Sequence, residues 1–432
     1  MIKKIFLFVL IILINQTAYA VTLSESLLLA YKNNPELNAE RENIKVSKED
    51  LKISKSEFLP TITLSGSKSQ ETTNKLTDRN GSNSSITDVD PETQSIDIEQ
   101  KIFQGFSGVA SIKKSQIGLN LAEAKLLKVE QDILYKAVEA YSGLLFSNEK
   151  LIINQDNVNL LERQVEADQA RLERGQITLA DLAQSESSLA GAQAKLIKAR
   201  NDLVTAKLTY EKIIGPINDF KTLDKNIDLD FEIPLDLNES IKISKINNPD
   251  LIISKLEFEQ SEKDMIIARS DLSPSATLSF NSSRTNDLSS TFNERDKEIL
   301  KATISWPIFK GGKNTASLNK SKNLRNRKKL LFDNAIKNNE TNVASAWSSL
   351  QSSESLLNSV KSQVKAAEIA NEGIIVEYES GLGRSTLDII QSNSLLLNAQ
   401  LSLADSEKNY ILAQFNLLKS IGLLNNEHLK IR

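Results

Sequence analysis

Two short turns hold the polar residues whose types and spacing could do chemistry. In the first turn Gly175 precedes Asp181, and in the second Gly381 precedes Asp388. Glycine supplies a backbone conformation that a helix interior disfavours, so each turn is expected to join two antiparallel helices. An acidic side chain in the first turn of the following helix suits the positive end of the helix dipole.

The chain offers little for catalysis. It has no cysteine and one histidine, His428, which we interpret as a solvated residue of a charged C-terminal tail. A Ser-His-Asp triad, a thiol nucleophile and a thiolate zinc site are therefore excluded, and a lone His is a poor metal site. The run from Phe309 to Asn314 has Gly-Lys followed by Asn, without the upstream glycine of a phosphate loop, and favours a strand-to-helix turn. We expect no enzyme and no catalytic, cofactor-binding or metal site; the net charge of −3 gives no reason to expect nucleic acid.

Residues 1–20 have the pattern of a cleavable signal peptide. Lys3 and Lys4 precede an apolar run over residues 5–14, and Ala18-Tyr19-Ala20 is a small-x-small cleavage site, with cleavage expected after Ala20. The apolar run is too short for a spanning helix, which needs about 20 residues. We therefore expect an exported chain without a helical membrane anchor. Such a chain can still span a membrane as a β-barrel.

The sequence is an internal duplication. The segment Asn33-Asn34-Pro35-Glu36-Leu37 recurs 214 residues later as Asn247-Asn248-Pro249-Asp250-Leu251. Ile102-Phe103-Gln104-Gly105 recurs 206 residues later as Ile308-Phe309-Lys310-Gly311, so the first copy has eight more residues between its strands. The predicted organisation is a signal peptide over 1–20, a first repeat over 21–214, a linker packed on the outside over 215–236, a second repeat over 237–422 and a tail over 423–432.

Long helices flank both turns. The helix before each turn is proline-free, from about Ser107 to Arg174 and from Lys313 to Glu379. A helix of about 65 residues is on the order of 100 Å long, far longer than a compact core needs. After each turn large residues fall every seven positions, with mostly small ones three positions later, a seam along which antiparallel helices approach closely. The large residues are Leu182, Leu189, Leu196, Leu203 and Tyr210, then Ile389, Leu396, Leu403, Tyr410 and Leu417.

Alternation of apolar and polar residues predicts four β-strands in two hairpins, at about 60–103 and 274–309. Each strand has one apolar face and the length of a tilted membrane-spanning strand. Polar loops join the strands of each pair, over Glu71 to Glu92 and Arg284 to Lys297. Hairpins on a soluble domain remain the alternative. Four strands cannot close a membrane barrel, whereas three chains would supply twelve.

Taken together, these features resemble the TolC family of outer membrane efflux proteins. The matching residues are the paired Asn-Asn-Pro-x-Leu segments, the Ile-Phe-x-Gly junctions and the glycine-to-Asp turns with their heptads. The resemblance implies a mainly α fold: a long antiparallel α-helical coiled-coil barrel with four transmembrane β-strands per chain, giving a 12-stranded, porin-like barrel in a homotrimer. It implies a passive exit duct in the outer membrane with a tunnel in the periplasm, serving a tripartite efflux or type I secretion system. The implied partners are outer membrane lipid, a periplasmic adaptor (membrane fusion) protein and an inner membrane pump or ABC exporter.

The resemblance also implies a gated periplasmic entrance. In it, Tyr378 and Arg384 would bond to Asp181, a pairing that suits the guanidinium fork and the phenol hydroxyl. Asp388 matches the first of two inward carboxylates, and Gln391 stands at the second, so a ring would hold one carboxylate per chain. Helix capping, packing or solvation are the simpler roles for these side chains. The residues expected in the tip turns and in adaptor docking are Gly175, Thr178, Gly381, Gly383 and Thr386.

The rival interpretation is a periplasmic or surface coiled-coil protein that never enters a membrane. Within the duct interpretation, the sequence does not separate drug efflux from protein secretion, because the pump partner decides the substrate.

Overall fold

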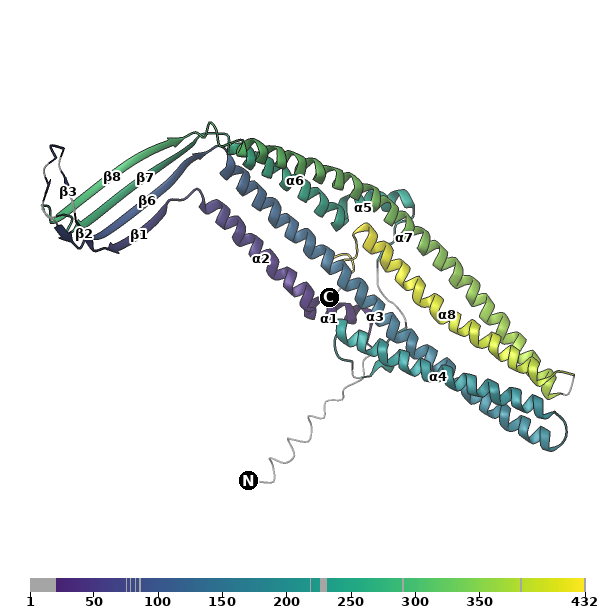
Figure 1. The fold of residues 1–432 in the computed structure, drawn as a ribbon. Coiled ribbons are helices and arrows are strands. Elements are labelled where there is room, and N and C mark those ends of the chain that lie inside the picture. Colours follow the sequence, from purple (N-terminus) through teal and green to yellow (C-terminus); the bar gives the residue numbers. More distant parts are fainter. Residues whose placement is uncertain are drawn as a thin grey trace, which may run out of the picture. The chain divides into compact units, whose positions relative to one another are not determined.

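The computed structural model describes residues 21–430 except 75, 78, 82, 85, 86, 218, 226–230, 290, 381 and 382. The expected signal peptide and Gly381 lie outside the described residues. The described chain runs twice through the same order of two helices, two long strands and two further helices (Figure 1). The first copy consists of α1 (Leu23–Asn33), α2 (Pro35–Ser56), β1 (Thr61–Lys68), β6 (Glu92–Gln104), α3 (Ser107–Glu173) and α4 (Leu179–Ile213). The second consists of α5 (Leu237–Asn247), α6 (Pro249–Ser270), β7 (Ser275–Asn286), β8 (Glu294–Ser305), α7 (Lys313–Glu379) and α8 (Thr386–Ile421).

The repeated Asn-Asn-Pro motif sets the start of α2 and of α6. The side chain of Asn34 accepts hydrogen bonds from the backbone N–H groups of Glu36 and Leu37, at 2.9 and 3.3 Å. Asn248 does the same at the start of α6. Asparagine is a strong N-cap, and proline suits the first helical position because its missing N–H would have no helical partner. The motif is thus a helix start used twice.

The chain divides into two compact units. One comprises the described parts of residues 1–41, 125–251 and 336–432, and the other residues 42–124 and 252–335. The second unit contains the sheet, in which the strand order is β1-β6-β7-β8 and every neighbouring pair is antiparallel. Strands β1 and β8 are therefore its two edges. No helix in the described part of the chain is long and apolar enough to cross a membrane.

Strand register gives the sheet one apolar and one polar face. Ile62 lies beside Ile98, Ile98 beside Phe280, and Phe280 beside Leu300, so apolar side chains line up across all four strands. The apolar residues of the first face are Ile62, Leu64, Ile96, Ile98, Leu278, Phe280, Leu300, Ala302 and Ile304. Toward the β7–β8 loop the same face carries the charged residues Lys68, Glu92, Arg284, Glu294, Asp296 and Glu298. The polar face holds Thr61, Thr63, Ser65, Ser67, Thr93, Ser95, Asp97, Glu99, Lys101, Thr277, Ser279, Asn281, Ser283, Thr285, Arg295, Lys297, Ile299, Lys301 and Thr303.

The loop between β1 and β6 is more ordered than its polarity suggested. Strand β2 (Glu71–Thr73) pairs with β5 (Thr87–Val89), and β3 (Leu76–Thr77) pairs with β4 (Asn83–Ser84). Short hairpin ladders satisfy backbone groups without an apolar face, so hydrophobic alternation could not reveal them.

The first unit has its main core where α1, α3 and α8 meet. Leu27, Tyr141 and Phe415 are fully buried there. The hydroxyl of Tyr141 lies 2.9 and 2.7 Å from the backbone carbonyl oxygens of Val21 and Asp224, which share its one hydrogen. A buried phenol needs such partners, and these two fix the chain on both sides of the core.

Two segments expected on the outside contribute to this core. Ile217 and Leu223 of the linker, and Leu424 and Leu429 of the C-terminal tail, are buried in it. His428 is half-buried rather than solvated, and its backbone N–H donates to the Asn425 side chain at 2.8 Å. The expectations of an outside linker and a solvated His428 were wrong on this point, because isolated apolar residues among charged ones give no periodic signal.

Candidate functional site

Both aspartates of the turns cap their own helices. Asp181 accepts a hydrogen bond from the backbone N–H of Thr178 at 2.9 Å, and its own N–H donates to the Thr178 hydroxyl at 3.2 Å. Asp388 and Ser385 repeat this arrangement at 2.8 and 3.3 Å. Each pair is a capping box. Hydrogen bonds from the Thr178 hydroxyl and backbone lower the pKa of Asp181, and those from the Ser385 backbone and hydroxyl lower the pKa of Asp388.

A buried carboxylate lies beside the first turn. Asp168 of α3 has no exposed surface. It accepts hydrogen bonds from the side chains of Gln164 at 3.0 Å, Ser185 of α4 at 2.6 Å and Tyr378 of α7 at 3.1 Å. A buried carboxylate is tolerated when several donors replace the lost water. Asp168 thereby joins the first helical hairpin to the second.

Tyr378 extends this network to α8 and back to α3. Its hydroxyl lies 3.1 Å from the hydroxyl of Thr386, which is 4% exposed. The guanidinium of Arg171 stacks over the Tyr378 ring, 4.0 Å from its centroid, a favourable cation–π position. All four helices near the turns are therefore connected through one tyrosine and one aspartate.

The structure brings the expected gate residues together only in part. Arg384 donates to Glu377 at 2.6 Å, and that contact raises the Arg384 pKa. Within the described part of one chain, neither Tyr378 nor Arg384 hydrogen-bonds to Asp181. Gln391 is exposed and Asp388 is half-buried.

The residues expected for docking differ in accessibility. Gly175 and Gly383 are exposed, with φ of 69° and 80°, and Thr178 is exposed at the start of α4. Thr386 is buried and bonded to Tyr378, so it belongs with the network around Asp168 rather than with the surface.

The second hairpin has its own buried polar pair. Ser392 of α8 donates to Asn371 of α7 at 2.8 Å, and both side chains are buried. Ser185 and Ser392 are equivalent in the duplication, but their acceptors are a carboxylate and an amide. Neither acceptor was predicted from the sequence. The available signal was that Asp168 continues the seven-residue spacing of Asn154 and Leu161, and Asn371 that of Leu357 and Val364.

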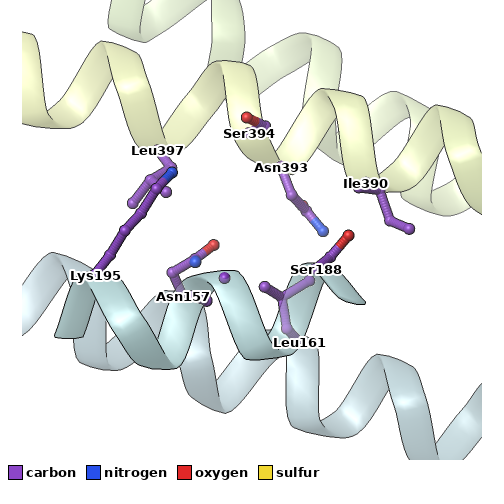
Figure 2. A pocket seen from close by; sticks show the side chains of 10 residues that line it. Asn157, Leu161, Ser188, Lys195, Ile390, Asn393, Ser394 and Leu397 are labelled. Atoms are coloured by element: carbon purple, nitrogen blue, oxygen red, sulfur yellow. The ribbon is translucent and has the colours of Figure 1, made fainter. Parts of the chain in front are cut away.

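A cavity separates α8 from the first hairpin close to this network. It has a volume of about 230 Å³, with Leu161 and Ser188 on one side and Ile390 and Leu397 on the other (Figure 2). Asn393 projects toward it from α8, and its side chain is 6% exposed. Neither amide atom of Asn393 has a hydrogen-bond partner among the described residues. In the same part of the chain, no group of three or more histidine or acidic side chains could hold a metal ion.

Comparisons with known proteins agree on one family. A family model described as "Outer membrane efflux protein" matches residues 27–216 and 241–423. The chain is 26% identical to the outer membrane efflux protein BepC of Brucella suis, over 98% of this chain and 90% of BepC. It is 19% identical to the alkaline protease secretion protein AprF of Pseudomonas aeruginosa, over 98% of this chain and 88% of AprF. The crystal structure of the outer membrane channel CmeC of Campylobacter jejuni has the same fold, with a TM-score of 0.82 at 17% identity over 93% of this chain and 85% of CmeC.

Proposed function

The chain belongs to the outer membrane efflux protein family, and we propose that three copies of it form the exit duct of a tripartite efflux or type I secretion system. The resemblance seen in the repeats is confirmed by this membership. The protein is an outer membrane efflux channel with a periplasmic tunnel, and it is not an enzyme. Our proposal concerns the assembly of three chains, the gate at the turns and the partner proteins.

The four-stranded sheet is the observation that supports the trimer best. Its apolar face lies open, with Leu64, Leu300 and Ile304 each more than 70% exposed. Among the described residues, no strand pairs with the outer edge of β1 or of β8. An exposed apolar face and two free edges favour pairing of the sheet with other chains. Four strands are too few for a single-chain membrane barrel, which needs at least eight. Three chains joined β8 to β1 would close twelve strands, with the apolar face toward lipid.

Aromatic residues near the ends of the sheet fit the same orientation. Phe106, Trp306 and Phe309 are 67%, 61% and 83% exposed where strands meet helices, and Phe292 is 66% exposed in the opposite loop. Aromatic rings favour the headgroup level on both sides of a membrane. The apolar face between them would then lie at the depth of the lipid chains.

The turns are the proposed periplasmic gate, formed by Asp181, Tyr378, Arg384, Asp388 and Gln391. The Tyr378–Asp168 hydrogen bond supports this role, because it ties the second hairpin to the first within a chain. Arg384 can exchange Glu377 for a carboxylate of a neighbouring chain at little cost, because an exposed ion pair is heavily screened by water. Asp388 would then supply one carboxylate per chain to the entrance.

Docking of a periplasmic adaptor is proposed at the exposed tips. Gly175, Thr178 and Gly383 offer accessible backbone and side chain there, and Gly381 lies outside the described residues. The adaptor would connect the duct to an inner membrane pump or ABC exporter. Co-purification after cross-linking, followed by identification of the captured adaptor, would tell efflux from protein secretion.

Fractionation and channel recording test the proposal directly. The protein should stay with the outer membrane after urea or carbonate washing, purify as a trimer and form channels in planar lipid bilayers. A periplasmic or surface coiled-coil protein would instead be released by the wash. Monomeric, water-soluble material without channel activity would refute the duct.

A further inference from the structure

The polar face of the sheet has an uneven distribution of charge. Its basic residues are Lys101 on β6 and Arg295, Lys297 and Lys301 on β8, whereas its acidic residues are Asp97 and Glu99, both on β6. The face therefore has more positive than negative side chains, and the excess lies on strand β8.

The basic residues of β8 form a row along one side of the strand. Arg295, Lys297 and Lys301 all project from the polar face. The residues between them that project from the opposite face are Asp296, Glu298 and Leu300, so the two acidic side chains are separated from the row by the strand itself. At about 3.4 Å per residue they span on the order of 20 Å along the strand. All three are exposed, and none of them forms an ion pair within the described part of the chain.

Neither acidic residue of the polar face lies beside this row. Asp97 accepts hydrogen bonds from Asn281 at 2.6 Å and from Ser95 at 3.1 Å, which holds it on the β6 side. Glu99 and Lys301 share a register line but lie two strands apart, with Ser279 between them. Two strand spacings are about 10 Å, close to one Debye length at 0.1 M salt.

We propose that Arg295, Lys297 and Lys301 are specificity-determining residues that bias the outer segment of the duct toward anions. This inference rests on the proposed function, in which the polar face lines a water-filled lumen. Three chains would place three such rows around the pore. Charges of one sign along a channel with low-dielectric walls raise the local concentration of counter-ions, so small anions and anionic solutes would be favoured there.

Lysines also occur on edge strands simply to prevent unwanted pairing. That role needs charge at the edge but no particular face, and it would leave ion selectivity unchanged. The two explanations therefore differ in a measurable way.

The test compares ion selectivity in the purified trimer. Reversal potentials are recorded in planar bilayers across a KCl gradient for wild type, for the single variants Lys297→Gln and Lys301→Gln, and for the triple variant with Arg295→Gln. The chloride-to-potassium permeability ratio should fall by about twofold or more in the triple variant, with smaller falls in the single variants. The effect should shrink near 1 M salt, where the Debye length is about 3 Å.

Lys68→Gln is the matched control. Lys68 is an exposed lysine on β1. It lies opposite Glu92 in the strand register and projects from the same face as Ile62 and Leu64. Its replacement removes the same charge and should leave the permeability ratio unchanged. An unchanged ratio in the channel-forming triple variant, or an equal fall in Lys68→Gln, would overturn the inference and leave the duct standing. A wild-type protein that forms no channel would overturn the proposed function and this inference with it.

Discussion

Tyr378 and Asp168 are 210 residues apart in the chain, yet the Tyr378 hydroxyl donates to Oδ1 of Asp168 at 3.1 Å. This hydrogen bond joins the helical hairpin of the second repeat to that of the first. Its acceptor is a buried side chain of α3 and not the capping aspartate of the turn. Separation of the two hairpins must therefore break a bond to a buried carboxylate.

Removal of that bond should open the entrance. Tyr378→Phe deletes the donor and leaves the ring over which Arg171 stacks, so the hairpins should lose a hydrogen bond to a carboxylate, worth about 1.5–3 kcal/mol. Single-channel conductance in planar bilayers should rise. Arg384→Ser should add to the rise if Arg384 contacts a neighbouring chain, and unchanged conductance in the double variant would count against the latch.

Asp168→Ala distinguishes this bond from a general loosening, because alanine removes the acceptor. If Tyr378 and Asp168 act as one unit, the conductance of the double variant Tyr378→Phe/Asp168→Ala should differ strongly from the sum of the two single effects. Ser392→Ala, which breaks the bond to Asn371 inside the second hairpin alone, is the matched control. A rise of equal size in the control would assign the effect to hairpin stability.

Asn393→Leu should stabilise the protein. The Asn393 amide is buried and has no hydrogen-bond partner among the described residues, beside a cavity lined by Leu161 and Leu397. An unsatisfied buried polar group costs about 1–3 kcal/mol, and an apolar side chain of similar size removes that cost. The midpoint of thermal unfolding should rise by a few degrees. A lower midpoint would contradict the expectation that the Asn393 amide is an uncompensated cost.

Gly422→Ala should be among the most damaging small substitutions. Gly422 ends α8 with φ of 83°, and a Cβ there would lie 2.3 Å from the backbone carbon and oxygen of Asn247. Neither backbone can yield without moving a helix end, so the loss of stability should be at least about 3 kcal/mol. Gly143→Ala is the control, since its Cβ would meet nothing within 4 Å, and helix propensity predicts a gain of up to about 1 kcal/mol. Urea denaturation of both variants measures the difference, and equal losses would contradict the clash.

Acid should fray the helices that start at the turns. The pKa of Asp181 and of Asp388 is lowered by their capping hydrogen bonds. A carboxylate with a lowered folded pKa stabilises the fold fully above its unfolded pKa of about 3.9, and this contribution is lost as pH falls through the folded value. Amide exchange at the start of α4 and α8, corrected for intrinsic rates, should be constant from neutral pH to about pH 5 and faster below about pH 3. Asp181→Asn should abolish the pH dependence at α4 only; persistence there would rule out the cap.

The elements that follow from local periodicity could be predicted from the sequence. The proline-free runs predicted the long helices to within a residue of α3 and α7, and period-two alternation predicted the strands of the sheet. Heptad spacing marks one buried seam, so it located residues such as Leu196 and Ile389. Each of these signals is contained within a single element.

What depends on packing between distant segments could not be predicted in the same way. Asp181 was the expected acceptor of Tyr378, and Asp168 was missed because its sequence context is that of any polar residue of an amphipathic helix. The burial of Leu223 and Leu429 was missed because single apolar residues in irregular segments have no period. The charge row on β8 became visible only when the register showed which side chains share a face.

Because Asp168 and Asn371 are unlike acceptors, the two repeats of one chain are not chemically equivalent. The two hairpins of a chain are alike in backbone order, but one encloses a carboxyl group and the other a carboxamide. A ring of three chains would contain six hairpins with the same backbone order. Around the ring, hairpins with a buried carboxyl group would alternate with hairpins with a buried carboxamide. Its rotational order would remain three, and a ligand or subunit with sixfold periodicity would meet two chemically different kinds of position around the same circle.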